Sequence, residues 1–253
     1  MRIPNCAALP LTETVASVDE LPSALSRLGL GVTRPVLVSV GGASGLDAVV
    51  ADWLLALFRD RLAPLLDRLG AAVVDGGTDA GVMALMGQAR RAAGARFPLL
   101  GVAARGTVHL PGEPMGTGVA LEPNHSHRLL VPGARWGDEI PWMNAVATLL
   151  GTGHSSATLV AAGGRITGLD VDASLAHERP TLLLAGSGGT ADAIANAGAS
   201  AEWPHRLIQV VPRDDDWGGL VAALTGLLVE GASVGCAVES EVRPDEKHHV
   251  SGS

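Results

Sequence analysis

Three segments of this 253-residue chain share one pattern: a short apolar run, a cluster of glycines and small residues, and then a stretch with helical periodicity. The three clusters occupy residues 41–45, 76–81 and 186–192. A short, continuous apolar run is typical of a strand buried on both faces of a parallel sheet. A strand that enters a helix through a glycine turn exposes backbone N–H groups and the positive end of the helix dipole, where anions bind. The repeated pattern therefore predicts a nucleotide-binding edge.

Strand-like and helix-like stretches alternate through most of the chain. We expect strands at residues 35–40, 71–74, 98–103, 128–131, 157–161, 180–185 and 207–211, and helices near 18–28, 47–69, 79–93, 140–150, 170–177, 192–197 and 217–228. Pro64 is expected to kink or divide the longest helix. This alternation predicts an α/β fold, namely a Rossmann-like, doubly wound, mostly parallel sheet with helices on both faces. We expect an N-terminal extension over 1–34, one domain over 35–230, and a polar, mobile tail over 231–253.

Composition narrows the classes of function. The net charge of −8 argues against general nucleic-acid binding, which relies on basic patches, but leaves room for a small anion held by backbone amides. No apolar stretch is long enough to span a membrane, and the N-terminus lacks the apolar core of a signal peptide, so we expect a cytoplasmic protein. Cys6 and Cys236 suggest free thiols in a reducing compartment, with a disulfide between the terminal segments as the alternative.

The first and third glycine clusters are candidate phosphate cradles. Glycine allows a positive φ and a close backbone approach to a ligand, although a tight turn that only packs helix on sheet is the structural alternative. The spacing of the first cluster matches neither a P-loop nor G-x-G-x-x-G, which disfavours a standard NTPase or dehydrogenase. The candidate ligand-binding residues are Gly41, Gly42 and Ala43 in the first cluster, and Gly186, Ser187, Gly188, Gly189, Thr190 and Asp192 in the third.

The second cluster opens a predicted helix. Thr78 or Asp79 could simply cap that helix, but paired glycines also leave amides free for a phosphate or ribose, and Asp75 could accept a hydrogen bond from a ribose hydroxyl. The candidate ligand-binding residues here are Asp75, Gly76, Gly77, Thr78 and Gly81.

Two polar segments lie in the middle of the chain. Asn124 and His125 are candidate ligand contacts; no metal site is assigned, because His125 and His127 have no third ligand in metal-like spacing nearby. Asp138 and Glu139 precede a helix, whose dipole favours acidic residues there, but they could also serve acid–base chemistry. Trp136 or Trp142 could stack on a base, or both could pack in a core that is poor in aromatic residues.

Together the segments resemble the N-terminal SLOG-type domain of the melastatin (TRPM) channels, and more closely the prokaryotic LSDAT proteins of the SLOG superfamily. The motifs that carry the resemblance are Val38-Ser-Val-Gly-Gly-Ala43, Asp75-Gly-Gly-Thr-Asp-Ala-Gly-Val-Met83, Gly101-Val-Ala-Ala-Arg-Gly-Thr-Val-His109, Asn124-His-Ser-His127, Gly137-Asp-Glu-Ile-Pro141 and Gly186-Ser-Gly-Gly-Thr-Ala-Asp192. They follow one another in matching order and spacing over roughly residues 35–200. The resemblance implies a Rossmann-like fold with a pocket for nucleotide-derived ligands, which in some channels is ADP-ribose.

The chain departs from the ADP-ribose-binding pattern at two positions. The family's third glycine turn can end in Arg where this chain has Gly189, and the E-I-P segment can be followed by a residue and then Arg where this chain has Met143. Arginine–phosphate pairs are strong and bidentate, so their loss bears on the choice of ligand. The candidates to compensate are Arg105, His109 and Arg128.

These observations favour a sensor or binder of an ADP-ribose- or NAD-like ligand, with no certain cofactor and with a homo-oligomer as a possible assembly. The alternative is an N-glycosidic phosphoribohydrolase or NAD-glycohydrolase-like enzyme, with Glu139, Asp138 or Asp192 as its acid or base. The P-G-G-x-G-T-x-x-E motif of such hydrolases is not matched, which favours the non-enzymatic reading. A third hypothesis is a scaffold whose pocket is vestigial.

Overall fold

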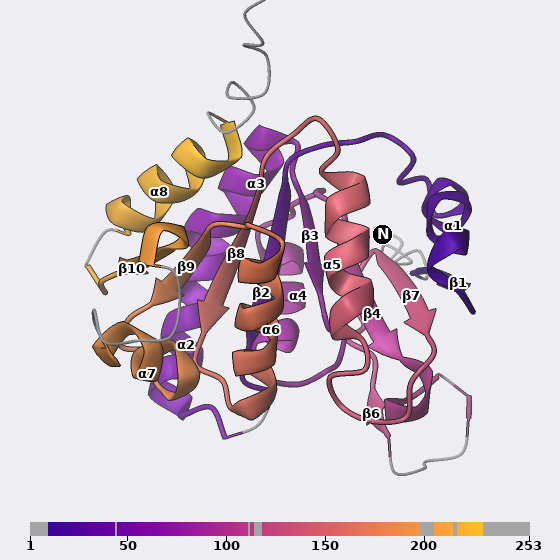
Figure 1. Cartoon of the computed structure of the whole chain (residues 1–253). Helices are drawn as coiled ribbons and strands as arrows, with labels where there is room; N and C mark the ends of the chain where they lie inside the picture. The colour runs from indigo at the N-terminus through magenta and orange to yellow at the C-terminus, as the bar shows by residue number, and fades with distance from the viewer. Residues whose placement is uncertain are drawn as a thin grey trace, which may run out of the picture.

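A single parallel sheet organises the molecule. The computed structural model describes residues 10–43, 45–110, 112–113, 118–197, 205–214 and 217–229. Eight strands follow the order β1-β7-β4-β3-β2-β8-β9-β10, and each neighbouring pair is parallel (Figure 1). They are β1 (Leu11–Thr14), β2 (Val36–Gly41), β3 (Ala72–Asp75), β4 (Leu99–Ala104), β7 (His127–Val131), β8 (Ser156–Ala161), β9 (Thr181–Leu184) and β10 (Ile208–Val211). A separate two-stranded ladder joins β5 (Val108–His109) to β6 (Val119–Ala120).

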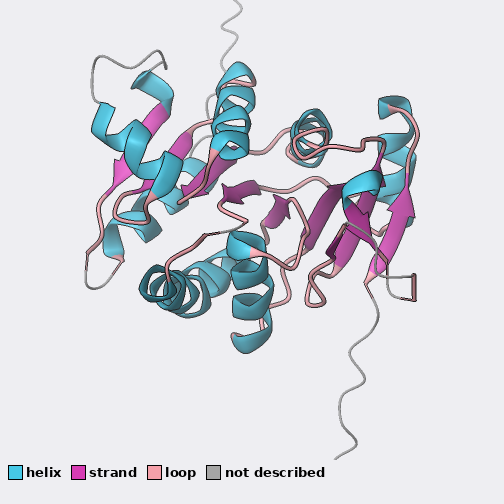
Figure 2. Cartoon of the chain, turned by 90° about the horizontal axis from the view of Figure 1, so that it is seen from below, coloured by secondary structure: helices cyan, strands magenta, loops and turns pink. Residues whose placement is uncertain are grey.

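Helices cover both faces of the sheet (Figure 2). On one face lie α2 (Ala48–Leu57), α3 (Ala63–Leu69), α4 (Gly81–Ala92) and α8 (Gly218–Val229); on the other lie α1 (Leu21–Arg27), α5 (Ile140–Leu150), α6 (Arg165–Ala176) and α7 (Gly189–Ala197). Successive β2 side chains alternate between the two cores, with Leu37 in the first and Val36 and Val38 in the second. The predicted doubly wound Rossmann-like fold is confirmed.

The strand order reverses between β2 and β8. From β2 the chain proceeds to β3 and β4 on one side of the sheet, whereas from β8 it proceeds to β9 and β10 on the other. The connections leaving β2 and β8 therefore diverge, and a crevice opens beyond the carboxyl ends of these two strands. In open α/β sheets this switch point is where ligands bind.

The predicted division of the second helix at Pro64 is confirmed. Between α2 and α3 the helix widens into a π-helical turn, η2 (Phe58–Leu62), and the N–H of Ala63 donates to the carbonyl of Phe58 five residues back. Pro64 lies in the first turn of α3, where its missing N–H costs least. The helix ends at Gly70, whose φ of 60° is in the left-handed region favoured by glycine.

The segment ahead of residue 35 takes part in the fold. Strand β1 forms one edge of the sheet beside β7, with Leu11 opposite His127. Leu21 and Leu25 of α1 are buried in the core of the second face, and α1 is preceded by a short turn, η1 (Val18–Glu20). The expected tail at 231–253 and both cysteines lie outside the described residues. In the part of the chain that the structure describes, no helix is long and apolar enough to cross a membrane.

Candidate functional site

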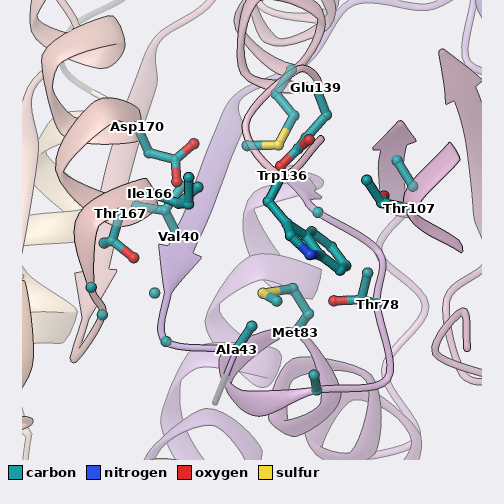
Figure 3. A pocket seen from close by; sticks show the side chains of 18 of the residues that line it. Val40, Ala43, Thr78, Met83, Thr107, Trp136, Glu139, Ile166, Thr167 and Asp170 are labelled. Atoms are coloured by element: carbon teal, nitrogen blue, oxygen red, sulfur yellow. The ribbon is translucent and has the colours of Figure 1, made fainter. Parts of the chain in front are cut away.

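A cavity of about 580 Å³ lies at the switch point, in the size range of small-molecule sites (Figure 3). Its wall is assembled from the turns that follow β2, β3, β4, β7 and β8. The lining residues are Ser39, Val40, Gly41, Gly42, Ala43, Gly76, Thr78, Ala80, Met83, Ala103, Ala104, Thr107, Val119, Trp136, Glu139, Met143, Gly163, Gly164, Arg165, Ile166, Thr167 and Asp170. Five loops therefore converge on one space.

The β2 turn needs its glycines for close packing. A Cβ on Gly41 would overlap the carbonyl oxygen of Ala161, and one on Gly42 would lie 3.3 Å from the amide nitrogen of Gly163. The carbonyl oxygen of Gly42 also accepts a hydrogen bond from the N–H of Val82, at 3.0 Å, at the start of α4. These contacts bring the first glycine turn against the turn that follows β8.

The turn from β8 into α6 supplies the strongest anion-binding feature of the cavity. Gly163 has a φ of 103°, and Gly164 is the N-cap residue of α6, with no side chain capping the helix. The first intrahelical bond runs from the N–H of Gly168 to the carbonyl of Gly164, so the preceding amides of the first turn have no intrahelical acceptor. Arg165 is the only basic residue among the described residues that line the cavity. Free amides, helix dipole and guanidinium together favour a phosphate here.

Two carboxyl groups line the cavity, one from the residue before α5 and one from α6 (Figure 3). Glu139 precedes α5, and its Oε1 and Oε2 accept hydrogen bonds from the N–H of Gly137 at 3.1 and 3.0 Å. Burial, followed by the nearby charge of Asp138, raises the pKa of Glu139. Burial and the charge of Glu139 raise the pKa of Asp170 in α6 to about 8. A pKa of about 8 keeps Asp170 mostly protonated at neutral pH.

The third glycine turn lies outside the cavity lining. Asp192 accepts hydrogen bonds from the N–H groups of Gly186 and Gly188, at 2.7 and 3.0 Å. The Asp192 side chain therefore already accepts from two amides that the sequence suggested as phosphate donors.

This third turn supports the β8–α6 turn instead. The N–H of Thr190 donates to the carbonyl of Gly163 at 3.0 Å, and its hydroxyl donates to the carbonyl of Gly164 at 2.9 Å. The Ser187 hydroxyl accepts from the N–H of Ala162 at 2.8 Å. A Cβ on Gly189 would overlap the carbonyl of Gly163. The turn therefore fixes the backbone that lines the cavity.

Asp75 and His125 form a buried cluster with Glu122 behind the second glycine turn. The imidazole Nε2 lies 2.8 Å from an Asp75 oxygen, and Nδ1 lies 2.8 Å from a Glu122 oxygen. Burial alone would lower the pKa of His125, but the charges and hydrogen bonds of the two carboxylates outweigh it and raise that pKa to about 9. The Asp75 carboxylate also accepts from the N–H of Gly77 at 2.8 Å. The cluster holds the second turn in place.

The structure separates the predicted site residues into two groups. Those that line the cavity are Gly41, Gly42, Ala43, Gly76, Thr78 and Glu139; those outside the lining are Asp75, Gly77, Gly81, Asn124, His125, Asp138, Gly186, Ser187, Gly188, Gly189, Thr190 and Asp192. Asn124 bonds Glu122, and Asp138 accepts the amides of Ala134 and Arg135 at 3.0 Å each. Gly81 begins α4, where a Cβ would overlap the carbonyl of Gly42.

The two positions at which the ADP-ribose-binding pattern can have Arg lie in different places. Met143 lines the cavity, whereas Gly189 does not. Of the basic residues considered as replacements, Arg105 pairs with Glu113, and Arg128 is buried and donates to the carbonyl of Glu122; neither lines the cavity. His109 also lies outside the lining, with Nδ1 3.0 Å from the carbonyl oxygen of Gly118. The positive charge of the cavity lining comes instead from Arg165, at the start of α6, which was not among the sequence candidates.

Sequence reasoning missed the β8–α6 turn and its helix, including Gly163, Gly164, Arg165, Thr167 and Asp170. Helix α6 begins at Arg165, five residues before the expected start. The expected start was too late because Gly164, Thr167 and Gly168 have low helix propensity and favour a loop in the sequence. A sequence signal for this turn was nevertheless present, because the apolar run of β8 leads into Gly163-Gly164. The strand–glycine–helix pattern therefore occurs a fourth time.

One solved structure has a similar fold. The structural-genomics target TM1055 superposes with a TM-score of 0.51 at 20% identity, covering 75% of this chain and 96% of that one. The molybdenum cofactor carrier protein from Chlamydomonas reinhardtii gives a TM-score of 0.48 at 19% identity, covering 77% and 98%. Among curated proteins the comparison found no match. The model of the family described as "SLOG in TRPM, prokaryote" (LSDAT_prok) matches residues 34–219, and the chain therefore belongs to this prokaryotic LSDAT family.

Proposed function

We propose that this protein binds a nucleotide-derived ligand of the ADP-ribose or NAD type in the switch-point cavity. The observation that carries the proposal is the pairing of two glycine turns at the cavity floor, Gly41–Gly42 and Gly163–Gly164, with an uncapped helix start beside Arg165. In this arrangement phosphate oxygens accept hydrogen bonds from the first-turn amides of α6 and pair with the guanidinium. The rest of the nucleotide extends toward Trp136 and Thr107.

The chemistry of the wall suits such a ligand. Hydroxyl groups of Ser39, Thr78 and Thr107 lie among apolar side chains, and the Thr78 hydroxyl is buried without a hydrogen-bond partner. A buried polar atom without a partner is costly, so a ligand that supplies the missing hydrogen bond is favoured. Sparse polar groups in an otherwise apolar wall are usual in small-molecule sites.

The test is calorimetric titration with ADP-ribose of the unaltered protein and of Gly164→Asp. A Cβ at residue 164 meets no protein atom within 4 Å, so the aspartate fits. It caps α6 and gains a few tenths of a kcal/mol of stability, while it occupies the amides proposed for phosphate. Affinity should fall at least about tenfold, because a lost charge-assisted hydrogen bond costs about 1.5–3 kcal/mol.

The matched control is Gly168→Asp, which adds the same charge to the same helix outside the lining, where a Cβ also meets nothing. It should keep the affinity within about threefold of the unaltered protein. Equal affinity in the Gly164→Asp protein would overturn the phosphate position. A lack of binding to ADP-ribose, NAD and AMP would overturn the function.

A second candidate, N-glycosidic hydrolysis, rests on the two cavity carboxyls. Asp170 carries a proton at neutral pH and Glu139 is the candidate base. In such a reaction Asp170 would give its proton to the leaving base as the C–N bond breaks, while Glu139 takes one from the water that forms the new C–O bond. Asp138 and Asp192 are engaged with loop amides. Release of adenine from AMP, lost in Glu139→Gln, would support turnover; its absence would leave the binding function alone.

A further inference from the structure

The cavity wall contains an unusual pair of acids. Glu139 and Asp170 are each only 9% exposed, and they approach from the start of α5 and from the second turn of α6. In Figure 3 the Asp170 carboxyl group points from α6 into the cavity. Buried carboxylates are costly unless they are paired, because desolvation disfavours the charged form. A buried pair therefore needs an explanation.

Hydrogen bonds within the protein stabilise only one of the two carboxyl groups. Glu139 is held by the N–H of Gly137, but no hydrogen bond joins the Asp170 carboxyl to another described residue. Val40, Met143 and Ile166, which share the lining, are apolar. Burial, and then the charge of Glu139, raise the pKa of Asp170 to about 8, because two negative charges in this space would repel each other. A proton or a cation relieves this repulsion.

The remaining charged side chain of the lining is Arg165, at the α6 start assigned to phosphate. The strands β2 and β8 and the helix α7 contribute no charged side chain to the lining. The cavity is thus electrostatically divided: basic and amide-rich at the start of α6, and acidic near Glu139 and Asp170.

The same cavity contains an indole ring, that of Trp136. Its side chain is 46% exposed and lines the cavity from the loop before α5 (Figure 3). The face of an indole ring attracts cations more strongly than any other side-chain ring. Two carboxyl groups and an accessible indole form a combination that suits a flat, positively charged ring.

We propose that Glu139, Asp170 and Trp136 form a subsite for a cationic heterocycle, such as a pyridinium ring, on the same ligand whose phosphates bind at the start of α6. This inference rests on the proposed function and narrows it to nucleotides that carry a positively charged ring. The ring displaces the proton of Asp170, and both carboxylates then pair with the delocalised charge. A ribose diol would need a single carboxylate and would leave the second without a role.

The experiment compares NAD⁺ with NADH, which differ in ring charge and hardly in size, using ADP-ribose as the ligand without the ring. Binding is measured by calorimetry from pH 6.5 to 8.5. NAD⁺ should bind about tenfold more tightly than NADH, since a cation–π contact and a charge pair are both lost on reduction. The preference should increase with pH, as Asp170 loses its proton.

Asp170→Asn keeps the size of the side chain and removes its charge. We expect the NAD⁺ preference of this variant to be clearly smaller than that of the unaltered protein, because Glu139 and Trp136 remain while one charge is lost, and its affinity for ADP-ribose should stay within about threefold of the unaltered protein. Asp52→Asn is the matched control, because Asp52 is exposed on α2 outside the lining. The control should retain the full NAD⁺ preference.

The possible failures are distinguishable. Equal binding of NAD⁺ and NADH by the unaltered protein, or ADP-ribose binding with no NAD⁺ binding, overturns the cationic subsite and leaves the proposed function in place. An NAD⁺ preference in Asp170→Asn that is as large as in the unaltered protein overturns the role of Asp170. Absence of binding by all three nucleotides overturns the proposed function and the subsite together.

Discussion

The N–H of Thr190 donates a hydrogen bond to the carbonyl oxygen of Gly163, at 3.0 Å, and thereby joins the third glycine turn to the turn that lines the cavity. The neighbouring N–H of Ala191 makes the same kind of bond to Ala162, also at 3.0 Å. The α7 start thus acts on the ligand site through the backbone of the β8–α6 turn. A change in the third turn should alter both stability and ligand affinity without touching the cavity wall.

Ser187→Ala tests this support. The Ser187 hydroxyl is buried, accepts from the N–H of Ala162 and donates to the carbonyl of Leu184 at 2.6 Å. Its removal leaves a buried N–H without a partner, so the free energy of unfolding should fall by about 1–3 kcal/mol. Affinity for ADP-ribose should fall as well, because the Gly163–Gly164 backbone loses an anchor. Denaturant unfolding and calorimetry measure the two effects.

The matched control is Ser23→Ala, since the Ser23 hydroxyl donates to the carbonyl of Glu20 at an exposed site. We expect a change within about 0.5 kcal/mol and no change in affinity. If the Ser187→Ala protein is destabilised but binds ADP-ribose as well as before, the third turn supports the fold and not the site.

Asp170 should make stability depend on pH. Its pKa is about 8 in the folded protein, against an ordinary value of 3.8, so the folded state holds a proton that the unfolded state has lost. The free energy of unfolding should therefore decrease as pH rises between about 4 and about 8, by at most about 1.4 kcal/mol per pH unit for this one group. Asp170→Asn should remove this group's part of the decrease and raise stability at pH 8. Urea unfolding across this range is the measurement, and identical pH slopes in the two proteins would contradict it.

His125 should add a second pH dependence at a higher range. Its folded pKa is about 9 against an ordinary 6.5, so its contribution to stability is fully present below about pH 6.5 and is lost as pH rises through about 9. This part of the decrease should persist in Asp170→Asn. If the stability of the Asp170→Asn protein does not change between pH 6.5 and 9, His125 is not held as a cation.

His125→Ala should be strongly destabilising. The substitution leaves the buried carboxyl groups of Asp75 and Glu122 without their shared partner, and breaking a buried ion pair costs about 3–5 kcal/mol. His154→Ala, at an exposed position, is the control and should change stability by less than about 0.5 kcal/mol. Thermal unfolding compares the two; a small effect in both would contradict the structural role of the cluster.

Much of the fold follows from local sequence signals. Buried parallel strands are continuous apolar runs, so residues 72–75 and 99–104 could be placed to within a residue or two. Gly70 and Pro64 act through backbone geometry alone, and both effects were predictable. The start of α6 was not, because glycines and β-branched residues disfavour a helix locally while tertiary contacts from Thr190 hold the turn that begins it.

The candidate site was less predictable because its features depend on distant partners. The third glycine turn has the expected backbone, but whether its amides are free depends on the orientation of Asp192, which sequence does not reveal. His125 is polar and lies close to a glycine turn in sequence, yet it is buried between two acids. Asp170 belongs to no motif in the sequence, and only the fold brings it close enough to Glu139 for their charges to interact.

The most direct test of the phosphate position is ¹⁵N-resolved NMR of the backbone amides during titration with ADP-ribose. The account predicts that the largest shifts occur at residues 165–167, which line the cavity in the first turn of α6 and whose N–H groups have no intrahelical acceptor. The amides of Gly186 and Gly188, which already donate to Asp192, should move little. If the largest shifts occur instead at Gly186 and Gly188, with residues 165–167 unchanged, the ligand binds at the third turn and the central claim is wrong.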